Sequence, residues 1–204
     1  MVNENKDQTT EEKILEAAKK VFIVKGMAGA RMQDIADEAS INKALLHYYF
    51  RNKEKLFETI FRESTKRFIP RINAILASDV PLFEKIETFC GEYIGKIIES
   101  PFIPLFLLNE MNKQPHSFLK KMWGTQKPDL TIFVRQTEDA IRKSVIKPVN
   151  PMHLVMNMIS MCVFPFVGKP ILLYVSGMDE SHFGQLMEQR KKEVPRFIID
   201  SIKK

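Results

Sequence analysis

Residues 32–57 read MQDIADEASINKALLHYYFRNKEKLF, and the pattern of these residues indicates how the N-terminal part of the chain folds. Apolar side chains recur at helical spacing at its start, which predicts a short helix over residues 32–39. A connection of three residues, SIN, leads into a second short helix predicted over residues 43–49. Two short helices joined by so tight a turn are typical of a helix-turn-helix, whose second helix enters the major groove of DNA.

The second of these helices has two unlike faces. Leu46 and Phe50 are four residues apart and share a face, which we expect to pack inward on Ile14, Phe22 and Ile35. The residues that then point away from this core are Lys43, Ala44, His47 and Tyr48. In this set the small side chain allows close approach to base edges, and the others offer hydrogen bonds to bases or charge for phosphates.

Helices are also predicted on both sides of this pair. Thr10 precedes the first, without a capping box because Lys13 stands three residues later, and Gly26 is expected to end it. After the pair, one long continuous helix is predicted from its cap Asn52 to about Ala77, because the apolar residues keep a single stripe. This fourth helix would link the N-terminal unit to the rest of the chain.

Composition and net charge do not identify a function. The formal charge of +6 permits an anionic partner without requiring one, and residues 1–78 and 79–204 carry +3 each. Cys90 and Cys162 lie far apart in apolar stretches, which predicts buried free thiols and no metal site. No cofactor is expected. The polar N-terminus and the short apolar runs indicate a cytoplasmic protein without a membrane segment.

The helices after Pro81 are longer and richer in methionine and phenylalanine. They are predicted over residues 82–99, 101–113, 117–146 with a break near 124–128, 151–167 and 179–203. Prolines at 165 and 195 predict a kink or break. The run PILLYVS at 170–176 resembles a strand, but no strand pattern is convincing. The expectation is an all-α chain with an N-terminal helix-turn-helix domain over 1–52, a linking helix over about 53–78, and a C-terminal domain over 79–204.

The N-terminal residues resemble one known family over about residues 10–62. The segments TEEKILEAAKKVFIVKG and MQDIADEASINKALLHYYFRNKEKLFETIF are similar to the DNA-binding domain of the TetR (tetracycline-repressor) family. The positions that fall in register are Ala18, Phe22, Gly26, Asp34, Ile35, Ala36, Ala39, Leu46, Tyr49, Phe50 and Lys53. The resemblance implies an all-helical, dimeric regulator of transcription, usually a repressor, that responds to a small molecule.

The resemblance also assigns roles by position. Candidates for base contact are Gln33, Lys43, Ala44, His47 and Tyr48, and candidates for phosphate contact are Arg31, Tyr49 and Lys53. The departures from the family pattern are Arg31 for a threonine, Ser40 for a glycine, Leu45 for a threonine or serine, and His47 for a tyrosine. These departures bear on which operator sequence is read. A left-handed backbone at the serine would cost about 1 kcal/mol more than at a glycine.

The C-terminal helices are interpreted as the ligand-binding and dimerisation domain that the resemblance implies. Candidate ligand-binding residues are Phe102, Phe106, Asn109, Met111, Trp123, Phe133 and Met156, and the same apolar set includes Met122, Met152 and Met161. Polar residues expected to point inward are Asn109, Glu110, His153 and Asn157. Because charges there are near parity, a hydrophobic or amphipathic inducer is expected. The helices at about 151–167 and 179–203 correspond to the family's dimer interface, which predicts a homodimer on a near-palindromic operator.

Two other classes of protein stay open. The chain has no GxGxxG, P-loop, GxSxG or HExxH motif and its four histidines are scattered, which disfavours an enzyme but leaves a helical enzyme without motifs possible. The second alternative is a helical protein–protein interaction module that kept the domain but reads no operator.

Overall fold

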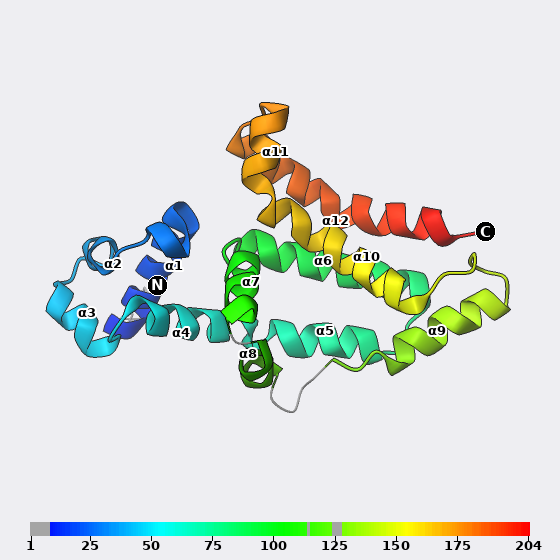
Figure 1. The fold of residues 1–204 in the computed structure, drawn as a ribbon, viewed down its shortest axis with the longest axis horizontal. Helices are drawn as coiled ribbons and strands as arrows, with labels where there is room; N and C mark the ends of the chain where they lie inside the picture. The colour runs from blue at the N-terminus through cyan, green and yellow to red at the C-terminus, as the bar shows by residue number, and fades with distance from the viewer. Residues whose placement is uncertain (1–8, 114, 124–127) are drawn as a thin grey trace, which may run out of the picture. The chain divides into compact units, whose positions relative to one another are not determined.

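The computed structural model describes residues 9–113, 115–123 and 128–204, without the side chains of residues 109, 110, 113, 115, 117, 121 and 122. These residues form helices joined by turns, and the only bridge among them pairs Ile146 with Lys203 (Figure 1). The predicted all-α fold is therefore confirmed. The chain divides into two compact units, Met1–Thr65 and Lys66–Lys204.

The first unit begins with a capped helix. Its helices are α1 (Thr10–Gly29), α2 (Met32–Glu38), α3 (Lys43–Tyr49) and α4 (Lys53–Lys66). The cap of α1 is Thr9, whose hydroxyl accepts from the backbone N–H of Glu12 at 3.2 Å while the Glu12 carboxylate accepts from the backbone N–H of Thr9 at 2.9 Å. This capping box lies one residue before the position considered from the sequence. Gly26 interrupts α1 with φ 65° and ψ 172°, as expected of a helix-ending glycine.

The core of the first unit is the one that the sequence predicts. All five residues expected to point inward are buried, with 5% or less of their surface exposed: Ile14, Phe22, Ile35, Leu46 and Phe50. Phe22 also packs edge-on against Phe57 of α4, with ring centroids 4.9 Å apart. The four helices of the first unit are thus held by one apolar core, which leaves the polar face of α3 outside it.

The single long fourth helix predicted from Asn52 to Ala77 is not continuous. It forms two helices, α4 and α5 (Phe68–Ala77), separated at Arg67. Pro70 accounts for the break, because it has no N–H to donate to the carbonyl oxygen of Lys66 and its ring would clash with that carbonyl. A proline is tolerated in the first turn of a new helix, so α5 begins two residues before it.

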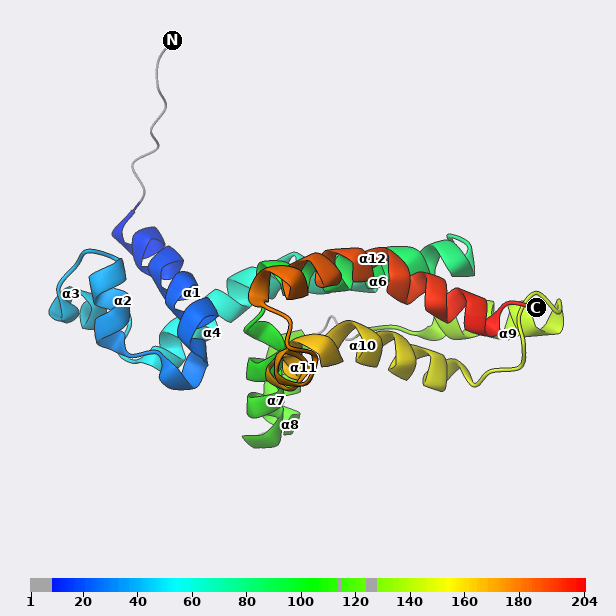
Figure 2. The same cartoon turned by 90° about the horizontal axis from the view of Figure 1, so that it is seen from above.

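The second unit is built from eight helices among the described residues. They are α5, α6 (Leu82–Glu99), α7 (Ile103–Lys113), α8 (Pro115–Trp123), α9 (Thr131–Arg142), α10 (Pro151–Val167), α11 (Lys169–Ser176) and α12 (Glu180–Ile202). The long helices α6 and α12 lie side by side, and α10 packs against both (Figure 2). Their facing sides form one apolar core, which includes Ile86, Ile94, Met158, Val194 and Ile198.

A buried lysine of α6 binds the carbonyl groups at the C-terminal end of α5. The Lys85 side chain is fully buried, and its ammonium group donates to the backbone carbonyl oxygens of Leu76 at 2.9 Å and Ser78 at 2.6 Å. Burial lowers the pKa of Lys85, while the negative charge of Asp79 opposes this effect. A cation at the C-terminal end of a helix satisfies carbonyl groups that have no partner within the helix. Lys85 therefore fixes the corner between α5 and α6.

The run PILLYVS is helical and forms most of α11. Pro170 stands in the first turn, and Gly177 closes the helix in the left-handed conformation with φ 68°.

Among the described residues no single helix is long and apolar enough to cross a membrane. Helices α10 and α11 taken together have the necessary length and apolar composition, but they are bent by 68° to one another.

The two cysteines lie in facing helices of the core. Cys90 of α6 and Cys162 of α10 are both free and fully buried, as predicted. A hydrogen bond with Cys90, together with burial, raises the pKa of the Cys162 thiol. A thiol that stays protonated in apolar surroundings is inert, so Cys162 behaves as a small packing residue.

Candidate nucleic-acid interface

Helix α3 presents a polar face supported by two buried side chains. The side chain of Asn42 caps the helix by accepting from the backbone N–H of Leu45 at 2.7 Å. Leu46 and Phe50 are buried beneath the helix, and the residues left exposed include the four predicted to point outward: Lys43, Ala44, His47 and Tyr48. The face of α3 therefore combines a cation, a small residue, an imidazole and a phenol. These are groups that can contact base edges and phosphates.

The imidazole of His47 is oriented by the backbone. Its Nδ1 atom lies 3.2 Å from the carbonyl oxygen of Arg51, just beyond the end of α3. The ring is exposed, so the second ring nitrogen, Nε2, remains available to a partner outside the protein.

The two tyrosines at the end of α3 form a pair. The rings of Tyr48 and Tyr49 meet edge to face, with centroids 5.4 Å apart. Tyr48 is 83% exposed and Tyr49 40% exposed, so both hydroxyl groups can be reached from outside the core. The adjacent ring limits the freedom of Tyr48, which reduces the conformational entropy lost when it contacts a partner.

Helix α2 is anchored by an aspartate at its start. Asp34 accepts from the backbone N–H of Arg31 at 3.0 Å and pairs with the ammonium of Lys25 in α1 at 3.0 Å. The bond from Lys25, followed by that from Arg31, lowers the pKa of the Asp34 carboxyl group. Gln33 lies exposed on the same turn, where its amide nitrogen donates to Asp37 at 2.7 Å and its amide oxygen is left to accept.

The turn between α2 and α3 uses a left-handed serine. Ser40 has φ 55°, and its backbone N–H donates to the carbonyl oxygen of Asp37 at 3.1 Å. The N–H of Ile41 donates to the carbonyl oxygen of Ala36 at 3.0 Å. This pair of bonds is the Schellman arrangement, in which the left-handed position is usually a glycine. The departure noted at Ser40 therefore carries the expected strain.

Lys53 has a role in the fold that the sequence does not reveal. Its ammonium group donates to the backbone carbonyl oxygen of Ala30, in the loop between α1 and α2, at 3.0 Å. An ammonium group has three donors, so two remain for a phosphate oxygen. Lys53 is the first residue of α4, and Asn52 caps that helix through the backbone N–H of Lys55 at 2.8 Å. The start of α4 thus places a cation beside free backbone donors.

The ligand candidates do not all lie together. Phe102, which directly precedes α7, is buried, as are Phe106 of α7 and Phe133 of α9, whereas Met111 and Trp123 are half-buried. Phe106 meets the ring of Phe118 of α8 at 6.0 Å between centroids. The side chains of Asn109, Glu110 and Met122 lie outside those described.

The candidates on α10 have a different position. Met152 and Met156 are 47% and 49% exposed, so they do not share the enclosed surroundings of the buried phenylalanines. His153 and Asn157 are also exposed, so the expectation that they point inward is wrong. The helical period turns these positions to the side of α10 opposite its buried residues Leu154 and Met158.

Three residues that support the interface were assigned no such role from the sequence. Asn42 caps α3, the Arg51 carbonyl orients His47, and the Ala30 carbonyl holds Lys53. An asparagine directly before a helical pattern is a cap signal that identifies the first of them. The other two act through backbone atoms, so their side chains give no signal.

Comparison with known proteins agrees with this geometry. The model of the family described as bacterial regulatory proteins, tetR family, matches residues 14–60. The chain is 39% identical over 111 residues to the HTH-type transcriptional repressor NicS of Pseudomonas putida, a match that covers 53% of this chain and 51% of NicS. The match thus spans about half the length of that relative.

Two solved structures share the fold over nearly the whole chain. The ketosteroid transcriptional regulator KstR2 of Mycobacterium tuberculosis superposes with a TM-score of 0.70 at 17% identity, covering 100% of this chain and 97% of that one. The transcriptional regulator FadR of Bacillus subtilis, solved in complex with stearoyl-CoA, has a TM-score of 0.60 at 16% identity, covering 93% of this chain and 98% of that one. At these identities the likeness concerns the fold.

Proposed function

Because the chain belongs to the tetR family of bacterial regulatory proteins, we propose that it is a DNA-binding transcriptional regulator, a homodimeric repressor that a small apolar or amphipathic molecule releases from its operator. The observation that carries the DNA-binding part is the face of α3. There Lys43, Ala44, His47 and Tyr48 are exposed, while Leu46 fastens the helix to the core. Such a helix fits a major groove, where bases expose distinct patterns of donors and acceptors.

The proposed contacts divide into two kinds. Base edges are read by the four exposed residues of α3 together with Gln33 of α2. Phosphates are held by Arg31, Tyr49 and Lys53, which flank that face at the ends of helices. Phosphate contacts set affinity and its dependence on salt, whereas base contacts set sequence preference.

The proposed dimer forms through α10 and α12. The exposed apolar residues of these helices are Met152, Met156, Ile159, Phe164 and Phe197. Three of them, Met152, Met156 and Ile159, recur every three or four residues and so lie along one stripe of α10. A stripe of this kind fits a second copy of itself about a two-fold axis. Two N-terminal units in one dimer would reach successive major grooves about 34–36 Å apart on a near-palindromic site.

Ligand response is proposed to act by linkage. If the ligand prefers a conformation of the dimer with a different spacing of the two reading helices, affinity for the operator falls by the factor by which the operator weakens ligand binding. Support for a ligand site in the second unit comes from its aromatic residues Phe102, Phe106 and Phe133 and from a shared fold with a regulator solved with stearoyl-CoA. Asn109, Met111 and Trp123 remain candidates for the same site, whereas the exposed Met156 is assigned to the proposed dimer interface. The proposed location of the protein is the cytoplasm.

Two measurements test the proposal. A gel shift with the DNA upstream of the protein's own coding sequence should show a salt-sensitive complex, and an unrelated sequence of equal length is the control. Equal affinity for both DNA fragments would favour an interaction module that reads no operator. Analytical ultracentrifugation should give a dimer at micromolar concentration, and Met156→Glu should shift it toward monomer. A wild-type monomer at that concentration would refute the homodimer.

A further inference from the structure

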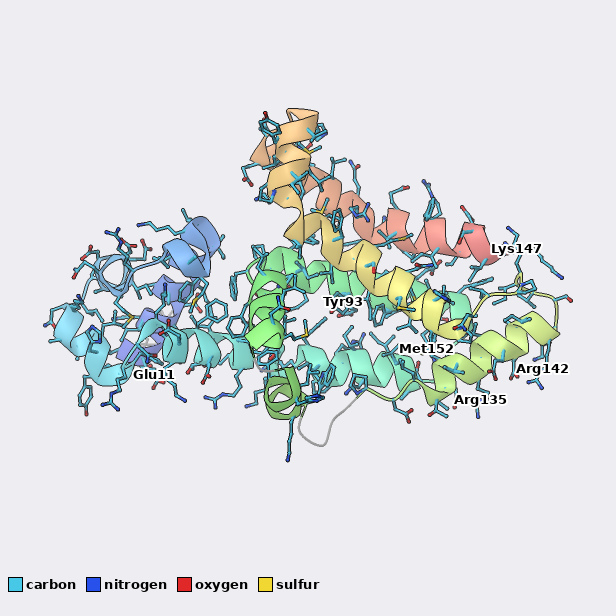
Figure 3. All side chains as sticks on the ribbon, in the orientation of Figure 1. Glu11, Tyr93, Arg135, Arg142, Lys147 and Met152 are labelled. Atoms are coloured by element: carbon cyan, nitrogen blue, oxygen red, sulfur yellow. The ribbon has the colours of Figure 1, made fainter. Side chains whose placement is uncertain are left out.

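Helix α3 carries an exposed apolar patch beside its polar groups. The patch consists of Leu45, Tyr48 and Tyr49, which have 36%, 83% and 40% of their surface exposed. Residues three and four positions apart share one side of a helix, so both tyrosines lie on the side of Leu45. Figure 3 shows side chains of α3 projecting outward from the first unit. Single apolar residues at a surface are common, but three on one side of a seven-residue helix form a continuous patch.

Leu45 offers a partner no hydrogen bond. Its side chain has neither a donor nor an acceptor, and its backbone N–H already donates to the side chain of Asn42 at 2.7 Å. The threonine or serine of the family pattern has a hydroxyl group that can bind a phosphate oxygen, whereas a leucine cannot. Whatever Leu45 meets on DNA, it meets through apolar contact.

Only one group on the base edges of the major groove is apolar. It is the 5-methyl group of thymine, and the other groups that distinguish base pairs there are hydrogen-bond donors and acceptors. A leucine placed over a donor or an acceptor would withdraw it from water without replacing its hydrogen bond, which costs free energy. A leucine placed over the methyl group removes apolar surface of both partners from water. An exposed leucine on a helix in the major groove therefore favours thymine.

The neighbours of Leu45 favour a close contact of this kind. Ala44 is exposed and small, so it allows the helix to approach the base edges. The rings of Tyr48 and Tyr49 meet edge to face with centroids 5.4 Å apart, on the same side of α3 as Leu45. Rings beside an apolar contact exclude water from it, which strengthens the contact.

We propose that Leu45 is a base-reading residue that recognises the 5-methyl group of a thymine in the operator. This inference rests on the proposed function and names one base of the operator together with the chemical group by which it is read. Leu45 and His47 are separated by about 160° of rotation around the axis of α3. They lie on opposite sides of the exposed face, so this thymine is a different base from the one that His47 meets.

The test removes the methyl group from the DNA and leaves the protein unchanged. An operator is selected from random DNA, and each thymine of one half-site is replaced in turn by 2′-deoxyuridine, which pairs like thymine and lacks only the 5-methyl group. Fluorescence anisotropy measures the Kd of the full-length protein for each DNA. At least one replacement should weaken binding about fourfold, as expected for one buried methyl-sized group. Unchanged Kd values at every position would overturn the proposal and place Leu45 against deoxyribose, which carries no sequence information.

Substitution of the leucine assigns the methyl contact to its side chain. Leu45→Ala and Leu45→Gln remove its apolar end with residues that favour a helix. In both variants the ratio of Kd values for uracil and thymine DNA should fall from about fourfold to below twofold. This ratio compares two DNAs on one protein preparation, so a partial loss of folded protein cancels. A ratio that stays fourfold in both variants would assign the methyl group to another residue and refute the role of Leu45.

The matched control is Leu105→Ala, the same change at a leucine of α7 that is 52% exposed. It should keep the fourfold ratio.

The same titrations separate this inference from the proposed function. Wild type that prefers the operator to unrelated DNA, but binds thymine and uracil DNA equally, would support the regulator and refute the reading role of Leu45. Wild type that binds operator and unrelated DNA equally would refute the sequence-specific regulator, and the inference with it.

Discussion

The Nδ1 atom of His47 lies 3.2 Å from the carbonyl oxygen of Arg51. A carbonyl oxygen only accepts, so this contact favours the tautomer that carries its proton on Nδ1 and a lone pair on Nε2. The exposed ring is thereby presented as a hydrogen-bond acceptor. His47 stands where the family pattern has a tyrosine, so we expect its orientation to influence which bases are read.

The tautomer of His47 predicts its base preference. In the major groove the donors are the amino groups of adenine and cytosine, so selection of bound sequences from a random DNA pool should yield one of these bases at the position that His47 meets. His47→Arg should move the preference at that position to guanine, whose O6 and N7 atoms accept, with about tenfold discrimination. Selection of guanine by the wild-type protein would contradict the assigned tautomer.

Lys53 is predicted to contribute one phosphate contact. Lys53→Gln removes the charge but keeps an N–H donor for the Ala30 carbonyl, so the fold should survive. Affinity should fall similarly for all DNA sequences, and the slope of log K against log salt should flatten by about 1.

The matched control for this change is Lys55→Gln, two residues further along α4. Lys55 pairs with Glu58 at 3.4 Å and is exposed. Fluorescence anisotropy over a salt series measures both variants. An equal change of slope for Lys55→Gln would show that Lys53 has no special position.

Ser40 is predicted to hold strain that a glycine would relieve. Ser40→Gly should raise the free energy of unfolding by about 0.5 kcal/mol, because the left-handed backbone costs less at glycine and the greater freedom of glycine in the unfolded chain offsets part of the gain. Ser144 has φ 56° just after the end of α9 and forms the same arrangement in the second unit. Ser144→Gly should therefore raise the free energy of unfolding by a similar amount. Urea denaturation followed by circular dichroism measures both, and a loss of stability in either variant contradicts the account.

Asp34 is predicted to make stability depend on pH. Its pKa is lowered in the folded protein, first by the bond from Lys25 and then by that from the Arg31 backbone. The stabilisation is therefore complete above the unfolded value, about 3.9, and is lost as pH falls through the lowered folded value. Asp34→Asn should destabilise the protein at pH 7, and the difference from wild type should shrink below about pH 4.

The ion pair provides the control for this prediction. Lys25→Gln removes the largest cause of the lowered pKa and should reduce the pH dependence, while Arg31 still donates through its backbone. Unfolding curves between pH 7 and pH 3 distinguish the outcomes. A difference between wild type and Asp34→Asn that is constant over this range would rule out the ionised carboxylate as its source.

Several predictions from the sequence depended on patterns within one helix and are confirmed. The periodicity of the apolar residues placed Leu46 and Phe50 in the core and predicted helices over 82–99 and 151–167, which are the bounds of α6 and α10. The prediction of one continuous fourth helix, which rests on its apolar stripe, is wrong. Pro70 divides the fourth helix, although that stripe continues through it.

The all-α fold, the helix-turn-helix and the polar face of α3 follow from the amino-acid sequence, because helix period, caps and turn residues act over a few neighbouring positions. What those side chains can contact depends on how distant segments pack. Lys53 reaches a carbonyl 23 residues away, and the ring of Tyr93 on α6 packs against that of Phe68 on α5. Such relationships arise from packing between distant segments. The contact between His47 and the Arg51 carbonyl is close in sequence, but it uses a backbone atom placed by the end of α3, which no side-chain pattern reveals.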